Sequence, residues 1–337
     1  MSKCSIIIPH FNGENILHRC LNSIYDHTKE KHEVIVVDNA SSDNSISMVK
    51  KKFPKTKIIS NKRNLGYAGA CNIGAEKSNT NFLVFLNNDT DVSKNWLEPL
   101  LESLKDESVS SVQPKIKNML NKNFFDYAGA SGGYIDIFGY PFCRGRIFNT
   151  IEKDKLQYES SEKIFWASGT AFATKKEIFI QSGMFDLMFF AHMEEIDYHW
   201  RSQLMGYDVM INPKSVIYHE GGQTLSYDSS KKTYLNHRNN LIMFLSNHKM
   251  SMLFLLFIPR ILLHVTSALV DFLSLKFNHS LAQITALLWV IVNPVYIMKK
   301  RFNNKKIKSD SYRLNGMVKK SIVFNYFILQ KRYFIKE

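Results

Sequence analysis

Cysteine is scarce in this sequence, and its four copies stand far apart along 337 residues. No two of them form a C-x-x-C pair, so neither a zinc site nor a dense disulfide framework is indicated. We expect reduced thiols of the cytosolic kind at all four positions, which are Cys4, Cys20, Cys71 and Cys143.

The sequence also lacks a leader pattern and two familiar glycine-rich phosphate motifs. The first apolar run, Ile6 to Ile8, is too short for the apolar region of a signal peptide and is closed by Pro9. No G-x-G-x-x-G follows this run, and no G-x-x-x-x-G-K occurs. A dinucleotide-binding fold of the Rossmann type and a P-loop are therefore disfavoured.

Acidic residues are few near the C-terminus, where basic residues gather. Residues 299–337 hold 12 of the 44 basic residues and two of the 30 acidic ones, so they carry +10 of the net charge of +14. The nearly balanced remainder argues against a nucleic-acid partner, and the basic tail is expected to meet an anionic surface. With 45% apolar and 22% charged residues, the chain as a whole is not intrinsically disordered.

Short apolar runs alternate with helical patterns in the first hundred residues. The runs at 5–8, 34–37, 57–59 and 82–86 predict buried strands, and apolar side chains recur at helical spacing between them. This alternation predicts an α/β fold with a mostly parallel sheet flanked by helices, and with ligands at the carboxyl ends of its strands.

The middle of the chain is less regular. Residues 129–145 predict loop and hairpin, and 194–205 predict a helix that Gly206 ends. Two short strands are expected at 209–211 and 216–218, leading to His219.

Residues 246–298 are strongly apolar and leave three alternatives open: a membrane span, a helix lying in the membrane interface, or a soluble core or dimer seam. The run 250–275 places its few polar side chains on one helical stripe, and 277–298 contains no charged residue. Because the basic tail follows, we favour association with an anionic membrane surface. The polar stripe, expected to face the headgroups, consists of Arg260, His264, Ser267 and Asp271.

Three polar positions have the chemistry of a catalytic site. Asp89 follows a buried strand, where a carboxylate can bind a hard divalent ion or merely cap a turn. His219 follows a strand and can ligate a metal or have a structural role. A helix start holds three carboxylates whose mutual repulsion would raise a pKa, as a general base requires, although solvated acids are also common there; these are Glu194, Glu195 and Asp197.

The order of the motifs carries more information than any one of them. The sequence reads SIIIPHFN at 5–12, VVDNASSD at 36–43, NLGYAGACNIG at 64–74, FLNNDT at 85–90 and GTAF at 169–172. The acidic turn, His219 and an HRN at 237–239 follow. Over about residues 3–245 this set resembles the inverting glycosyltransferases of family 2, particularly their rhamnosyltransferase-like branch.

The resemblance implies a GT-A fold, a nucleotide-diphosphate sugar and a divalent cation, Mn²⁺ or Mg²⁺. Asp89 and His219 would bind the cation, while Asn87 stands where the family's D-x-D motif has its first Asp, and Asp91 lies outside the motif. The residues that would bind the nucleotide sugar are Pro9, Phe11, Asn12, Asp38, Asn39, Asn64, Gly66, Asn72, Asn87 and Asn88.

In the mechanism that the resemblance implies, Glu195 takes the proton of an acceptor hydroxyl during a single inverting displacement. Glu194 and Asp197 would orient the base or the acceptor. We expect a GT-A domain at 1–245, divided into a nucleotide-binding half (1–110) and an acceptor half (111–245), then membrane-associating helices at 246–298 and the basic tail at 299–337.

The expected acceptor is a lipid-linked or cell-envelope glycan at the cytoplasmic face of the plasma membrane, and a homodimer is left open. Three other functions compete with this one. A nucleotidyltransferase would need a basic, Gly-rich loop after the first strand, and a processive synthase would show Gln-x-x-Arg-Trp and an array of spans; neither occurs. An inactive membrane-associated scaffold or glycan-binding protein stays open because of Asn87.

Overall fold

The computed structural model describes residues 3–221 and 229–335. Its N-terminal part alternates strands and helices, and it confirms the four strands and the intervening helices predicted from the sequence. The elements are β1 (Cys4–His10), α1 (Glu14–His27), β2 (His32–Asp38), α2 (Ser45–Lys52), β3 (Lys57–Ser60), α3 (Gly66–Lys77), β4 (Phe82–Leu86) and β5 (Thr90–Val92).

The second part of the sheet is built from longer-range elements. They are α4 (Leu97–Ser103), β6 (Val109–Asn118), β7 (Gly133–Asp136), β8 (Pro141–Cys143), β9 (Arg146–Ile147), β10 (Thr150–Ile151), β11 (Glu162–Ile164), β12 (Ala171–Lys175), α5 (Lys176–Gln181), the 3₁₀ helix η1 (Leu187–Phe189), α6 (Glu194–Leu204) and β13 (Asp208–His219). The hairpin expected within 129–145 is formed by β7 and β8, and the expected helix at 194–205 is α6.

One prediction here was wrong. The two short strands expected at 209–211 and 216–218 are one strand, β13, whose pairing with β6 shifts register between Asn212 and Val216. The shift breaks the apolar alternation in the sequence without ending the strand.

The main sheet has the order β11-β13-β6-β12-β4-β1-β2-β3, with β5 pairing to β13. Strands β4, β1, β2 and β3 are mutually parallel, and β12 is antiparallel to both β4 and β6. Helices α1, α2 and α4 pack on one face, where the side chains of Ile6 and Val36 point. Helices α3, α5 and α6 pack on the other face, beside Ile7 and Phe85. This burial on both sides explains the continuous apolar runs.

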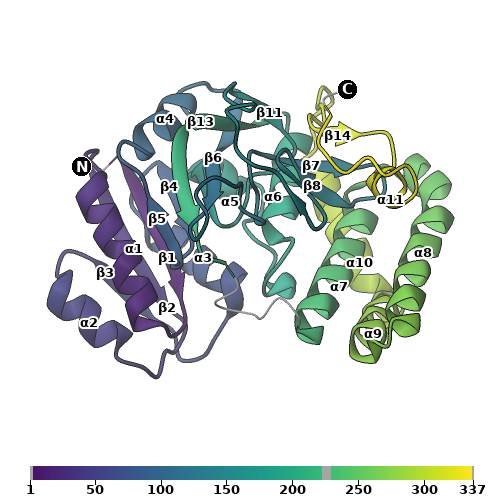
Figure 1. Ribbon diagram of the computed structural model, residues 1–337, viewed down its shortest axis with the longest axis horizontal. Helices are drawn as coiled ribbons and strands as arrows, with labels where there is room; N and C mark the ends of the chain where they lie inside the picture. Colours follow the sequence, from purple (N-terminus) through teal and green to yellow (C-terminus); the bar gives the residue numbers. More distant parts are fainter. Residues whose placement is uncertain (1–2, 222–228, 336–337) are drawn as a thin grey trace.

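The C-terminal third gathers at one end of the molecule, away from α1 and α2 (Figure 1). Its elements are α7 (Ser230–Asn247), α8 (Met250–Leu273), α9 (Phe277–Val292), α10 (Pro294–Lys306), β14 (Met317–Val318) and α11 (Ile322–Phe327). Strand β14 joins a second sheet of order β10-β9-β8-β7-β14. Much of the basic segment 299–337 is therefore built into α10, β14 and α11.

Helix α8 has the reverse of the polarity expected for it. Arg260 and His264 are each 1% exposed, because the polar stripe faces the protein. Arg260 donates hydrogen bonds to the Tyr140 hydroxyl and to Asn240 Oδ1. Helical spacing identified which residues share the stripe, but the expectation that the stripe faces the headgroups was wrong.

Candidate active site

Strands β5 and β13 bring the two predicted metal ligands together. Thr90 of β5 pairs with His219 at the end of β13, so Asp89 lies one residue before the rung that holds the histidine. The distance from Asp89 Oδ1 to His219 Nε2 is 3.2 Å. Both side chains are buried.

Asp126 is a site residue that the sequence reading missed. Its Oδ1 lies 2.8 Å from His219 Nδ1, on the opposite side of the imidazole from Asp89. A carboxylate on the second nitrogen fixes the ring orientation and the tautomer of a metal-binding histidine. Asp126 follows no strand or motif in the sequence that would single it out.

The imidazole of His219 lies between two carboxylates, and these charges shift the pKa values of His219 and Asp89. Burial alone would lower the pKa of His219, but Asp89 and Asp126 outweigh it and raise the pKa to about 10 when no cation is bound. Burial opposes ionisation of Asp89, yet His219 lowers the pKa of Asp89 below its ordinary value. Arg19 also lowers it, and the same guanidinium pairs with Asp91 and Glu220, so Asp91 lies outside the metal pair.

The residues present fit a divalent cation that keeps part of its shell for other ligands. Asp89 Oδ1 and His219 Nε2 face each other 3.2 Å apart, so a cation held by both side chains would take the place of the imidazole proton. Within 3–221 and 229–335, no three His, Cys, Asp or Glu side chains gather as a complete metal cage. A carboxylate and an imidazole would hold Mn²⁺ or Mg²⁺ while diphosphate oxygens and water supply the remaining ligands.

Residues predicted to bind the nucleotide sugar stabilise the turns after β1 and β2, and one of their hydrogen bonds joins the two turns. Asn12 Oδ1 accepts from the Ser42 N–H, and Asp38 Oδ1 accepts from the Ser41 N–H. Pro9 is half-buried within β1, whereas the Phe11 side chain is 42% exposed. These hydrogen bonds fix the two turns relative to each other. The exposed Phe11 ring beside them is an apolar surface that a ligand can contact.

Two further residues predicted to bind the nucleotide sugar, Asn39 and Asn64, form hydrogen bonds with the first residue of α3. Asn39 Nδ2 donates to the Gly66 carbonyl, and Asn64 Oδ1 accepts from the Gly66 N–H. Gly66 has φ +72° and lies against the backbone of Phe190, where a Cβ would clash. A glycine is therefore required at this position.

Asn72 and Asn88 differ in what they contact. Both ends of the Asn72 amide are occupied by the backbone of Phe185, so this residue holds the loop before α6. Asn88 Nδ2 lies 2.8 Å from His10 Nδ1 beside the metal pair. The Asn87 N–H donates to the Thr170 carbonyl, and its own carbonyl accepts from the Thr90 hydroxyl.

The predicted base lies in the first turn of α6. Glu195 is half-buried, and burial raises its pKa to about 7, although the Gly169 N–H stabilises the charged form. Burial together with the charge of Glu195 raises the pKa of Glu194 well above its ordinary value. One oxygen of each carboxylate has no hydrogen-bond partner. Two crowded, buried carboxyls of this kind resist losing both protons, so the one that ionises is a stronger base than an isolated carboxylate.

Asp197 is on the same turn but belongs to a different set of contacts. Its carboxylate accepts from Arg201, Lys300 and Asn247 and is fully buried. These bonds hold α6 against the C-terminal helices. The structure thus separates Asp197 from Glu194 and Glu195, each of which keeps one oxygen without a hydrogen-bond partner.

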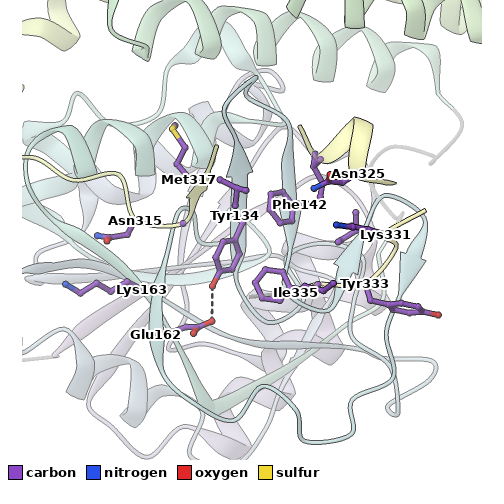
Figure 2. Close-up of a pocket in the computed structure, with 15 residues that line it drawn as sticks. Tyr134, Phe142, Glu162, Lys163, Asn315, Met317, Asn325, Lys331, Tyr333 and Ile335 are labelled. Atoms are coloured by element: carbon purple, nitrogen blue, oxygen red, sulfur yellow. Dashed lines mark hydrogen bonds between the residues drawn. The ribbon is translucent and has the colours of Figure 1, made fainter. Parts of the chain in front are cut away.

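The structure has one cavity beside these groups and another away from them. One of about 530 Å³ lies beside the start of α3, and its lining includes Asn64, Asn72 and Phe190. Another of about 480 Å³ lies between the second sheet and the C-terminal segment, with Tyr134, Phe142 and Tyr333 in its wall (Figure 2). No predicted site residue lines the second cavity.

The sequence matches the family model described as "Glycosyl transferase family 2" over residues 5–195, which is more than half of the chain. The chain belongs to glycosyl transferase family 2. The match covers the strands from β1 to β12, the Asp89 segment and the carboxylates Glu194 and Glu195, and it ends before β13 and His219.

Relatives of this family 2 chain include glycosyltransferases of several kinds. An uncharacterized glycosyltransferase of Haemophilus influenzae is 29% identical over 41% of this chain and 38% of its own length. Glycosyltransferase AglE of Haloferax volcanii is 31% identical over 32% of this chain and 37% of its own length. A probable N-acetylgalactosaminyltransferase 8 of Caenorhabditis elegans is 25% identical over 64% of this chain and 53% of its own length. The chain thus spans about half or less of these curated relatives.

Solved structures confirm the GT-A fold. GalNAc-T7, in a complex with UDP, GalNAc and Mn²⁺, superposes with a TM-score of 0.58 at 19% identity, over 72% of this chain and 47% of that one. The mannosyltransferase PcManGT of Pyrobaculum calidifontis, in a complex with GDP-Man and Mn²⁺, gives 0.52 at 14% identity, over 90% and 84%. At these identities the likeness concerns the fold.

Proposed function

We propose that this protein transfers a sugar, with inversion, from a nucleotide-diphosphate donor to the hydroxyl of a membrane-associated glycan. The observation that carries the proposal is the buried trio of Asp89, His219 and Asp126, at the carboxyl edge of a GT-A sheet, in a chain that also has a crowded carboxyl pair at 194–195.

The residues divide the chemical work between them. Asp89 and His219 would hold the divalent cation, which when bound supplies positive charge to the diphosphate leaving group. Glu195 takes the proton of the acceptor hydroxyl while the hydroxyl oxygen attacks the anomeric carbon from the face opposite the leaving group. Glu194, which stays protonated more readily, orients that carboxylate.

The donor proposed is a deoxythymidine-diphosphate rhamnose or a UDP-sugar. The motif order from 5 to 239 supports the rhamnosyl-like branch, and the fold neighbours were captured with UDP or GDP-Man. The half-exposed ring of Phe11 beside the Asp38 turn offers a stacking surface for the base of any of these nucleotides.

The proposed acceptor is lipid-linked because the C-terminal helices expose an apolar face. Phe254 is 81% exposed and Leu262 is 62% exposed, on the side of α8 opposite the buried Arg260. This face continues over α9 and α10 through Leu281, Leu288, Ile291, Val292, Val295, Met298 and Phe302. An apolar area of this extent on a soluble surface is costly in water and marks an interaction site.

The arrangement favours a helix that lies in one leaflet over a span. Helix α8 is long and apolar enough to cross a bilayer, and α9 with α10, bent by 72°, passes the same test as a pair. The inner side of α8, however, packs on the protein at Leu253, Arg260 and His264. Only its outer side is left for lipid, and the basic residues of 299–337 supply attraction to anionic headgroups. The cytoplasmic leaflet of the plasma membrane is therefore the proposed location.

Donor binding and slow donor hydrolysis, measured over a panel of nucleotide sugars with and without Mn²⁺ or Mg²⁺, test the transferase proposal. One donor is expected to bind in a metal-dependent way, and Asp89→Ala should abolish that dependence. Glu195→Gln should keep donor binding and lose transfer. If the folded wild type binds no donor, the inactive scaffold becomes the better description.

Flotation with vesicles of phosphatidylglycerol and phosphatidylcholine tests the membrane proposal. The wild type is expected to float, and Leu262→Lys to stay behind, because it places a charge in the apolar face. Leu156→Lys is the matched control, since it makes the same change at an exposed position outside the helices. Equal flotation of both variants, or a stable dimer that buries the face in light scattering, would contradict it.

A further inference from the structure

A buried ionic cluster joins helix α10 to the helix that carries the candidate base. Lys300 Nζ of α10 lies 2.8 Å from Asp186 Oδ2 and 2.9 Å from Asp197 Oδ2. Arg201 Nε lies 2.9 Å from the same Asp197 oxygen. Two carboxylates and two cations make the cluster neutral, and Lys300 is 8% exposed.

The two carboxylates that Lys300 contacts flank the candidate base, Glu195, in the sequence. Asp197 lies two positions after Glu195 on α6. Asp186 lies in the loop before α6 and accepts from the Met188 N–H at the start of η1. Lys300 therefore fixes the base helix and the loop that leads into it with one side chain.

That loop has a backbone that needs to be held. Phe190, His192 and Met193 all have φ between +61° and +72°, a region that side chains other than glycine rarely adopt. Asn239 Nδ2 donates to three carbonyls here, those of Phe189, Ala191 and His192. Strain next to a candidate catalytic carboxylate persists only when surrounding contacts determine the conformation.

Helix α10 also has an outward face of the opposite character. Tyr296, Lys300 and Asn304 recur every four residues on the inner face, where Tyr296 donates to Asp186 and Asn304 to Asn247. On the outer face, Val295 is 79% exposed and Phe302 is 61% exposed. One short helix thus connects the apolar surface to the base helix.

We propose that Lys300 is a positioning residue for Glu195. It holds the strained loop and α6 in register, so that the carboxylate of Glu195 stays where an acceptor hydroxyl can reach it. This inference rests on the proposed function, because it assumes that Glu195 is the base.

The test compares Lys300→Met with Lys50→Met in the full-length protein. Both remove one positive charge from a helix, but Lys50 is exposed on α2, outside the site and outside the basic segment 299–337. We expect Lys300→Met to lower kcat by about 10- to 100-fold, the loss typical of a displaced reacting group, with an unchanged donor dissociation constant. Lys300→Arg should recover part of the loss, and Lys50→Met should behave as the wild type.

Tyr296→Phe keeps the test decisive if Lys300→Met fails to fold. This change removes the hydroxyl that donates a hydrogen bond to Asp186. It is expected to give a smaller fall in kcat at a normal melting temperature. If the wild type transfers sugar, and Tyr296→Phe and a folded Lys300 variant have the same kcat as the wild type, the positioning role is overturned. Absence of transfer in the wild type with every donor would instead overturn the proposed function.

Discussion

Glu195 is subject to two opposing influences that set its protonation. Burial disfavours its charged form, while the Gly169 N–H and the start of α6 stabilise it, and the balance raises the pKa to about 7. A base with this pKa changes its charge within the physiological range, so its titration is open to measurement.

We expect kcat to rise as pH passes upward through about 7, because Glu195 must lose its proton before it can accept another. Below that pH, kcat should fall by roughly tenfold per unit. The measurement is kcat at saturating donor and acceptor over the pH range, with donor binding followed in parallel as the control. A flat profile would show that another group takes the proton.

Asp126 gives a second prediction for a single residue. Asp126→Asn is expected to weaken Mn²⁺ binding by about 10- to 100-fold, since the carboxylate that orients His219 would be lost. Isothermal titration with Mn²⁺ alone measures this without relying on turnover. Asp106→Asn, at an exposed position, is the control and should leave the affinity unchanged; an equal loss in both variants would argue against a role for Asp126.

Among the elements, the four strands at 5–8, 34–37, 57–59 and 82–86 and the base helix could be predicted because their signals are local. A buried strand such as 82–86 is an unbroken apolar run, and the carboxylates of α6 are neighbours in sequence. What the sequence leaves undetermined is which partner arrives from far along the chain. Asp197 resembles its neighbours until Lys300 is seen to pair with it, and Asp126 meets His219 from a loop without a motif.

Helix α8 illustrates a related limit. Helical periodicity groups Arg260 with His264, but it carries no information about what the group faces. The partners of Arg260, Tyr140 and Asn240, come from a hairpin and another helix. Only their positions reveal that the polar side is internal and the apolar side is external.

At the scale of the whole molecule, the C-terminal third is part of the core. Val290 and Ile297 pack in one cluster with Ile196 and Trp200 of the base helix, and β14 extends the second sheet. The boundary expected at residue 245 therefore falls inside a shared apolar core.

A chain that ends at residue 245 should accordingly be much less stable than the full protein. It would lose Lys300, the ion-pair partner of Asp186 and Asp197. Removing one partner of a buried ion pair typically costs about 3–5 kcal/mol, and the lost apolar packing adds to this. Thermal unfolding followed by circular dichroism measures the difference. If the fragment melts cooperatively near the full-length protein, 1–245 is an independent domain after all.

The pairing of Thr90 with His219 has a consequence for how this chain can vary. The two candidate metal ligands come from distant parts of the sequence, yet one rung of the β5–β13 ladder sets their separation. Insertions or deletions in the loops between them can reshape the proposed acceptor side and leave that rung intact. Specificity and metal chemistry can thus diverge independently within one polypeptide.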